Sequence, residues 1–262
     1  MKTYDEPIYG NWIPGKLLLG LWAAGTLLSV LFLLSLTLWK NTALQLISCL
    51  LTSLILGCAL YMQTCHRAFS FQGGRLMQKI HWLVLDCLPW DGRGKLLDIG
   101  CGSGALSIRC ARKYADASVV GVDCWGRTWE HGKARCEENA RLAKVENTEF
   151  IQGDARALPF EDESFDAVVS NFVFLEVRSE KDKRLLVKEA LRVVKKGGSF
   201  ALHDMFDDRQ LYGDIHLLLK ELREAGVSRI YYQPSTEDLP FIPDFVRSPL
   251  MLHHLGMIYG IK

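Results

Sequence analysis

Two long uncharged runs near the N-terminus constrain this chain most. Leu17–Trp39 and Ala43–Met62 carry no charged residue, and only Lys40-Asn41-Thr42 separates them. As α-helices rising about 1.5 Å per residue, runs of this length reach roughly 30 Å, the thickness of the hydrocarbon core of a bilayer. The short connection predicts an antiparallel α-helical transmembrane hairpin, with spans at about residues 17–39 and 43–62.

Flanking cations predict how this hairpin is oriented. The side that holds both outer ends of the hairpin carries Lys2, Lys16, His66, Arg67, Arg75 and Lys79. The turn between the runs holds Lys40 alone. Since cytoplasmic flanks are enriched in Lys and Arg, both ends of the hairpin are expected in the cytoplasm. The chain is therefore predicted to be an integral membrane protein with its remaining residues cytoplasmic and the lipid bilayer as a partner.

Three other interpretations of the apolar runs stay open. A cleaved signal peptide has a shorter apolar core and a small-residue cleavage site, whereas a second long run follows here at once. A buried pair of soluble helices is a second possibility, although soluble helices seldom lack a polar face over 20 residues. A soluble protein whose apolar N-terminus mediates oligomerisation is the third.

Composition argues against two classes of partner. Lys and Arg number 31 against 30 Asp and Glu, so the charge gives no support for a nucleic-acid partner, which usually needs a basic face. Eight cysteines include no Cys-x-x-Cys pair and no Cys/His cluster with zinc-like spacing, so no metal is expected. The thiols are expected to be free, in a reducing compartment.

Strand and helix patterns alternate from Lys95 onward, which predicts a parallel sheet with helices on both faces. Strands are predicted near 95–99, 118–123, 148–152, 165–170, 198–204, 228–233 and 255–261. Helices are predicted at 76–88, 104–114, 127–143, 181–194 and 211–225. The predicted organisation is an N-terminal segment at 1–66, a connector and helix at 67–94, and one α/β domain at 95–262. Residues 234–252 are long and proline-rich for a connection, which is typical of a lid or binding loop.

The strand Leu96–Ile99 leads into a glycine-rich loop with Gly100, Gly102 and Gly104 at alternate positions. Such spacing lets the backbone turn sharply and approach a ligand closely. The loop also satisfies a loose dinucleotide pattern, so a nicotinamide-dependent oxidoreductase is an alternative. Asp98 argues against it, because a carboxylate there repels a pyrophosphate and attracts an ammonium group.

Further polar residues follow the next predicted strands. Asp123 ends a buried strand about 20 residues past the loop, a position that suits a ribose diol. Asp154, followed by Ala155, could face an adenine amino group, and Asn171 ends the fourth strand. Neighbouring residues complete the candidate cofactor site, namely Cys101 and Cys124.

These ordered segments resemble the class I S-adenosylmethionine (SAM)-dependent methyltransferases, over roughly residues 74–226. Within that family, Leu158-Pro159-Phe160 and Ser164-Phe165-Asp166 resemble the subgroup containing quinone-biosynthesis and small-molecule methyltransferases. The resemblance implies a Rossmann-like seven-stranded sheet whose last strand is antiparallel. It also implies SAM as cofactor, S-adenosylhomocysteine as product, Asp123 on the ribose and Asp154 beside the adenine.

The resemblance implies transfer of a methyl group to a small acceptor. Asn171-Phe172-Val173-Phe174 departs from the Asn/Asp-Pro-Pro-aromatic motif of many amino-methylating relatives, which disfavours nucleic-acid substrates. The hairpin joined to this domain favours a lipophilic or membrane-associated acceptor. His203, Asp204 and Glu176 are the candidate catalytic residues. A catalytically silent SAM-binding membrane module is the alternative, and the sequence leaves the acceptor atom and the oligomeric state open.

Overall fold

The computed structural model describes residues 6–38, 41–126 and 132–262. It divides into two compact units. One holds residues 10–78, and the other holds residues 79–262 together with the chain before Gly10, of which residues 6–9 are described.

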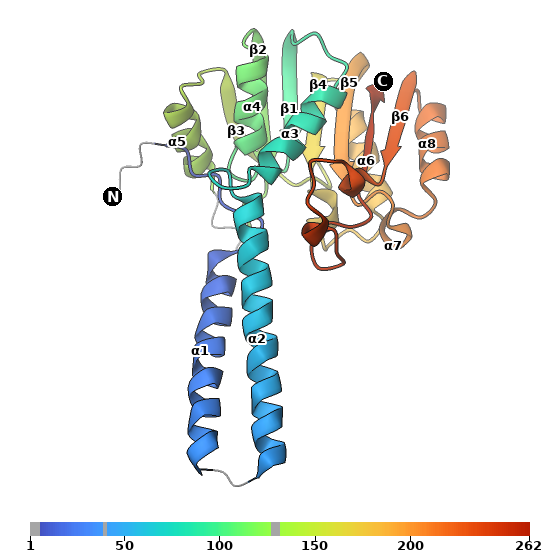
Figure 1. The fold of residues 1–262 in the computed structure, drawn as a ribbon. Coiled ribbons are helices and arrows are strands. Elements are labelled where there is room, and N and C mark those ends of the chain that lie inside the picture. The colour runs from blue at the N-terminus through green and yellow to red at the C-terminus, as the bar shows by residue number, and fades with distance from the viewer. Residues whose placement is uncertain (1–5, 39–40, 127–131) are drawn as a thin grey trace. The chain divides into compact units, whose positions relative to one another are not determined.

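Residues 10–78 are built around two long helices, α1 (Gly15–Leu38) and α2 (Thr42–Phe69), which pack on each other (Figure 1). Asn41 caps α2 by accepting hydrogen bonds from the backbone of Ala43 and Leu44. Both helices are long and apolar enough to cross a membrane. Large side chains on them are open, and Leu19 is 72% exposed. In an aqueous protein these surfaces would be unfavourable, because burying such side chains contributes about 1.5–3 kcal/mol each.

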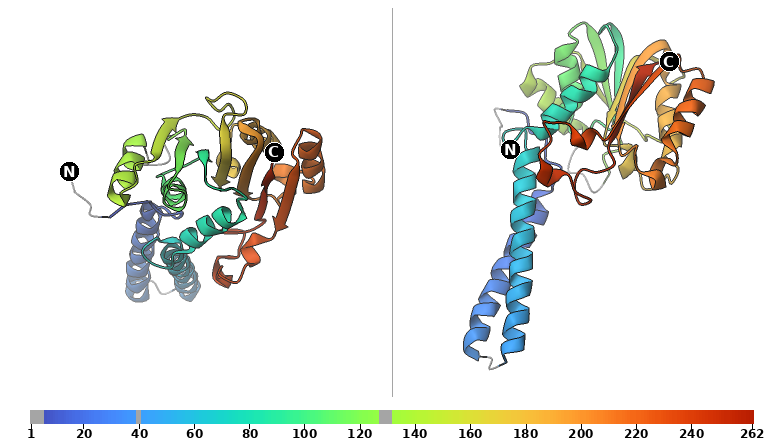
Figure 2. Two further views of the ribbon diagram at one scale, coloured as in Figure 1. Left: turned by 90° about the horizontal axis from the view of Figure 1, so that it is seen from above. Right: turned by 45° about the vertical axis from the view of Figure 1, so that its right-hand side comes forward.

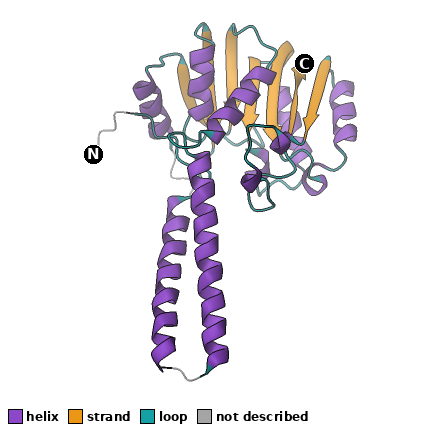
Figure 3. Cartoon of the chain, in the orientation of Figure 1, coloured by secondary structure: helices purple, strands orange, loops and turns teal. Residues whose placement is uncertain are grey.

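The other unit is a seven-stranded sheet with the order β3-β2-β1-β4-β5-β7-β6 (Figure 3). Its strands are β1 (Gly94–Ile99), β2 (Ala117–Asp123), β3 (Thr148–Gln152), β4 (Phe165–Asn171), β5 (Val194–Asp204), β6 (Arg229–Pro234) and β7 (Gly256–Ile261). All pairs are parallel except those of β7, which runs antiparallel to β5 and β6. The predicted seven-stranded α/β sheet is thereby confirmed.

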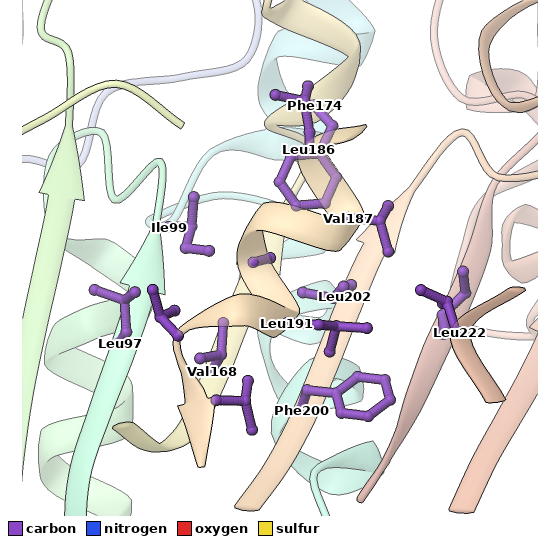
Figure 4. Packing of buried hydrophobic residues seen from close by; sticks show 14 of the residues in the cluster. Leu97, Ile99, Val168, Phe174, Leu186, Val187, Leu191, Phe200, Leu202 and Leu222 are labelled. Carbon is purple, nitrogen blue, oxygen red and sulfur yellow. The ribbon is translucent and has the colours of Figure 1, made fainter. Parts of the chain in front are cut away.

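Helices cover both faces of the sheet, as Figure 2 shows. One face carries α3 (Leu76–Cys87), α4 (Ala105–Lys113) and α5 (Lys133–Ala143). The other carries α6 (Lys183–Arg192), α7 (Arg209–Tyr212) and α8 (Ile215–Glu224). Figure 4 shows how Leu97, Val168 and Phe200 of the central strands meet Leu186 and Leu191 of α6. Alternate residues of each strand thus enter opposite cores, as a sheet buried on both faces requires.

Several predicted boundaries need correction. The helix predicted at 211–225 is divided, because Gly213 adopts φ +67° and Asp214 then caps α8 by accepting from the backbone of His216. The strand predicted at 198–204 begins at Val194, with a register shift against β4. The helix predicted at 127–143 begins at Lys133, and its residues 127–131 lie outside the described residues.

Candidate functional site

The carboxyl ends of β1, β2, β4 and β5 meet at one edge of the sheet. The chain order reverses between β1, which pairs with β2 on one side, and β4 on the other. Open α/β sheets bind their ligands at such a switch point. The glycine-rich loop leaves β1 here, and Asp123, Asn171 and Asp204 end neighbouring strands at the same edge.

The three loop glycines all adopt left-handed backbone conformations, with φ +71° at Gly100, +58° at Gly102 and +80° at Gly104. A Cβ at Gly100 would overlap the side chain of Val173, and one at Gly104 would lie 3.1 Å from Phe150. At Gly102, by contrast, a Cβ would meet no described atom within 4 Å. Packing therefore accounts for two of the glycines. The third presents open backbone, as close approach of a ligand requires.

The carboxylate of Asp123 is fixed beside this loop. One oxygen accepts a hydrogen bond from the Gly102 backbone N–H at 2.8 Å, and the other accepts from Trp125 N–H at 2.8 Å. The Trp125 indole N–H in turn donates to the Gly102 carbonyl at 2.9 Å. The structure thus brings the predicted ribose acid and the open glycine together. The sequence did not predict that Trp125 joins them.

Asp98 lies beneath the loop, with only 1% of its surface exposed. Its carboxylate accepts a hydrogen bond from Ser107 Oγ at 2.5 Å. Burial raises the pKa of Asp98 to about 7 and the charge of Asp123 adds to this, while the Ser107 hydrogen bond opposes it. A carboxyl group with such a raised pKa is only partly ionised near pH 7. A cation that binds beside it favours the ionised form.

The cysteines around the loop differ in role. Cys101 and Cys136 are both buried. The hydrogen bond between their thiols is the largest cause that raises the pKa of Cys101, and burial is the next. Cys136 Sγ lies 3.2 Å from the Gly102 carbonyl, which it contacts as a weak donor. Cys124 is exposed after β2, and its carbonyl accepts from Gln152. The raised pKa of Cys101 keeps its thiol protonated.

Asp154 forms an ion pair with Arg156, with a shortest distance of 2.6 Å. The Arg156 hydrogen bond lowers the pKa of Asp154, whose side chain is 44% exposed. An exposed pair of this kind contributes little stability. Ala155 packs against the main core between them. The sequence prediction placed Asp154 beside an adenine. It did not include the ion pair with Arg156, which lies only two residues further along the chain.

His203 links three segments at the strand ends. Its Nδ1 lies 2.9 Å from Asn171 Oδ1, and its Nε2 lies 2.8 Å from Thr236 Oγ1. An amide oxygen only accepts, so this network assigns the proton to Nδ1 and makes Thr236 the donor to Nε2. Burial lowers the pKa of His203 to about 3, so the ring is neutral. Both ring nitrogens form hydrogen bonds, so His203 has a structural role: it connects β5 to Asn171 and Thr236. Its catalytic role stays a prediction.

Asp204 faces the opposite side of the sheet from His203, because successive strand residues alternate. Its carboxylate accepts from the backbone N–H groups of Met205, Phe174 and Leu175. Burial raises the pKa of Asp204 to about 6, against these hydrogen bonds. Glu176, in the short 3₁₀ helix Phe174–Glu176, is exposed. His203 and Asp204 thus face opposite sides of the sheet, and Asp204 contacts the turn that carries Glu176.

The connection between β6 and β7 lies at the same edge, since β6 ends beside the start of β7, which pairs with the end of β5. It contains two 3₁₀ turns, Thr236–Asp238 and Asp244–Val246. Buried Thr236 anchors it to His203, whereas Phe245 and Leu250 are 42% and 76% exposed. The sequence showed a long proline-rich loop but gave no signal for the contact between Thr236 and His203. A lid at 234–252 stays a prediction.

Comparison with known proteins finds a methyltransferase domain in the central part of this chain. Residues 96–198 match the family model of a methyltransferase domain. Demethylmenaquinone methyltransferases from Roseiflexus castenholzii and Lactococcus lactis are each 36% identical, over 117 and 104 residues. These alignments cover 45% and 39% of this chain, and 45% and 38% of the relatives. The chain thus matches less than half the length of these curated relatives.

Solved structures agree on the fold. A phosphoethanolamine N-methyltransferase from Haemonchus contortus, in complex with SAM, matches with a TM-score of 0.54 at 18% identity, over 70% of this chain and 52% of that one. A [4+2]-cyclase, SpnF, matches with a TM-score of 0.51 at 25% identity, over 64% and 63%. The family match covers the glycine loop, Asp123 and Asp154, the segments on which the sequence resemblance rests. Residues 96–198 are thus similar to a methyltransferase domain, and the sheet around them has the fold of solved methyltransferases.

Proposed function

We propose that this protein transfers a methyl group from SAM to a small lipophilic acceptor at a membrane. The observation that carries the cofactor assignment is the open backbone of Gly102 between two acids, Asp98 and Asp123. Those acids suit an ammonium group and a ribose diol, and they disfavour a pyrophosphate. Relatives named for demethylmenaquinone methylation support an acceptor of the isoprenoid-quinone class.

In this proposal the residues mainly bind and orient. When bound, SAM supplies an electrophilic methyl group: the acceptor's electron pair forms the new bond to the methyl carbon as the carbon–sulfur bond breaks, which leaves S-adenosylhomocysteine. The loop at Gly102 and the carboxylates of Asp98 and Asp123 would hold the cofactor in one orientation. Where the acceptor must lose a proton, Glu176 is the predicted base whose side chain is exposed.

Anchoring in the bilayer is the second part of the proposal. Helices α1 and α2 support it by their length and their open apolar surfaces. We expect the full-length protein to stay in the membrane pellet after washes with high salt and alkaline carbonate, and to dissolve only in detergent. Release by salt would instead favour the soluble protein with an oligomerising apolar N-terminus.

The acceptor class is tested with native membranes that contain the full-length protein. After incubation with SAM carrying a labelled methyl group, we expect the label in the organic phase of a lipid extract, at least tenfold above membranes without the protein. A lipid extract from cells that cannot methylate their quinones serves as the enriched acceptor. Label found only in a water-soluble product would contradict the lipophilic acceptor. SAM binding without any transfer would favour the silent module.

A further inference from the structure

The segment before α1 reaches the side of the sheet that carries α5. The backbone N–H of Ile8 donates to Asn139 Oδ1 at 2.8 Å, and Asn139 Nδ2 donates back to the Ile8 carbonyl at 2.9 Å. Asn139 belongs to α5 and is 1% exposed. One buried amide therefore holds both backbone groups of a residue 131 positions away in the sequence.

The same side-chain amide also forms a hydrogen bond with the glycine loop. Asn139 Nδ2 donates to the Ser103 carbonyl at 2.9 Å, and Ser103 Oγ donates to the Tyr9 carbonyl at 2.7 Å. Ser103 is buried, and Tyr9 packs against the apolar cluster that contains Cys101 and Phe150. Four hydrogen bonds thus connect residues 8 and 9 to the loop through one asparagine and one serine.

This arrangement restrains the loop from a second side. Asp123 and Trp125 hold Gly102, and Ser103, the next residue, is held by Asn139 and Tyr9. A loop with three glycines has many accessible conformations, and binding is weakened by the entropy lost when they are restricted. Contacts that fix the loop beforehand reduce that loss.

We propose that Ile8 and Tyr9 form a strap that, through Asn139 and Ser103, positions the glycine loop for SAM. Cofactor affinity then depends on the chain segment that leads into the first apolar helix. Asn139 and Ser103 act as positioning residues. This inference rests on the proposed function, because it concerns the same cofactor loop. Linkage requires the reverse effect as well: SAM must stabilise the bound strap by the same factor.

The main test compares two asparagines whose side chains hold backbone carbonyls, in the full-length protein in detergent. Asn139→Ala removes the bonds to Ile8 and Ser103. Asn147→Ala is the matched control, since Asn147 Nδ2 donates to the carbonyls of Ala111, Tyr114 and Ala117, away from the loop. We expect Asn139→Ala to raise the Kd for SAM about tenfold or more, within the usual range of coupling between sites. Asn147→Ala should stay within about twofold of wild type, although both lower the Tm.

Ser103→Ala is the milder second variant, since it removes only the hydroxyl that donates to Tyr9. It should raise the Kd for SAM by about threefold to tenfold and raise the KM for SAM with little change in kcat, as expected for lost positioning of the cofactor. In wild type, SAM should slow hydrogen exchange at the Ile8 amide, and Asn139→Ala should abolish that protection.

The outcomes separate the two proposals. If wild type binds SAM but Asn139→Ala and Ser103→Ala bind it as tightly, the strap is overturned and the proposed function stands. Exchange at Ile8 that SAM leaves unchanged would overturn the strap in the same way. If wild type binds no SAM, the proposed function fails and the strap inference fails with it.

Discussion

Replacing Asp98 by Asn is expected to stabilise the protein above neutral pH while weakening SAM binding. Burial raises the pKa of this carboxyl to about 7, from the ordinary value of 3.8. A group whose folded pKa is raised contributes stability that is complete below about pH 4 and is lost as the pH rises through 7. Asn carries no buried charge, and its side-chain oxygen still accepts from Ser107. At pH 8 the gain in the free energy of unfolding is at most roughly 4 kcal/mol, because the two pKa values differ by about three and each unit corresponds to about 1.4 kcal/mol.

The same substitution removes the charge predicted to face the ammonium group of SAM. Losing a charge-assisted hydrogen bond costs about 1.5–3 kcal/mol, so the Kd should rise about 10- to 100-fold. In wild type the affinity should increase with pH up to about 7, as Asp98 ionises, and fall above about 8, where an α-amino group loses its proton. Asp98→Asn should lack the acidic limb. Calorimetric titration across pH, with thermal unfolding of the unliganded protein, measures both effects.

Asp166→Asn is the control for the sign of this effect. Burial opposes ionisation of Asp166, but hydrogen bonds from Lys195 and the Lys95 backbone outweigh it and lower the pKa of Asp166. Its stabilisation is present above the ordinary pKa and lost as the pH falls, so Asp166→Asn should lower the Tm at pH 8. An Asp98→Asn variant that melts lower at pH 8, or binds SAM as wild type does, would contradict this account of Asp98.

Gly102→Ala is expected to abolish most SAM binding at little cost in stability. With φ +58° and no described atom within 4 Å of its Cβ position, alanine there costs about 1–2 kcal/mol of backbone strain. The added methyl group occupies the open face of the loop. It displaces a ligand that approaches the backbone, so we expect the Kd for SAM to rise about 100-fold or more.

Gly197→Ala provides a matched comparison. Gly197 has φ +77°, and a Cβ there would likewise meet no described atom within 4 Å. It lies near the start of β5, whereas the glycine loop follows the end of β1. Both variants should lower the Tm by a similar amount, and only Gly102→Ala should lose SAM binding. Equal SAM affinity in the two variants would show that the open face of Gly102 is not the cofactor site.

Local patterns explain how much of this fold the sequence predicted. The uncharged runs at 17–39 and 43–62 and the strand–helix alternation from Lys95 are local patterns, and they predicted the helix pair and an α/β sheet covered on both faces. The antiparallel seventh strand was predicted by the family resemblance. The helix predicted at 211–225 was wrong as one element, because Gly213 interrupts a continuous apolar pattern. An isolated glycine costs a helix only about 1 kcal/mol relative to alanine, so Gly213 alone did not mark a break.

Long-range contacts explain what the sequence did not predict. The glycine loop and Asp123 follow strands of one sheet, so their proximity followed from topology. The pairing of His203 with Thr236 and of Asn139 with Ile8 depends on how separate segments pack, and no periodicity encodes it. His203 was chosen for its residue type and its place at a strand end. Its hydrogen-bond partners show the structural use that type and place alone do not reveal.

Calorimetric titration of the full-length wild-type protein with SAM and, separately, with NAD tests the central claim most directly. The account predicts SAM binding at one site per chain, displacement by S-adenosylhomocysteine, and no heat of binding with NAD. In the same titration Gly102→Ala should bind neither ligand detectably, and Gly197→Ala should match wild type. Saturable binding of NAD without binding of SAM would contradict the account.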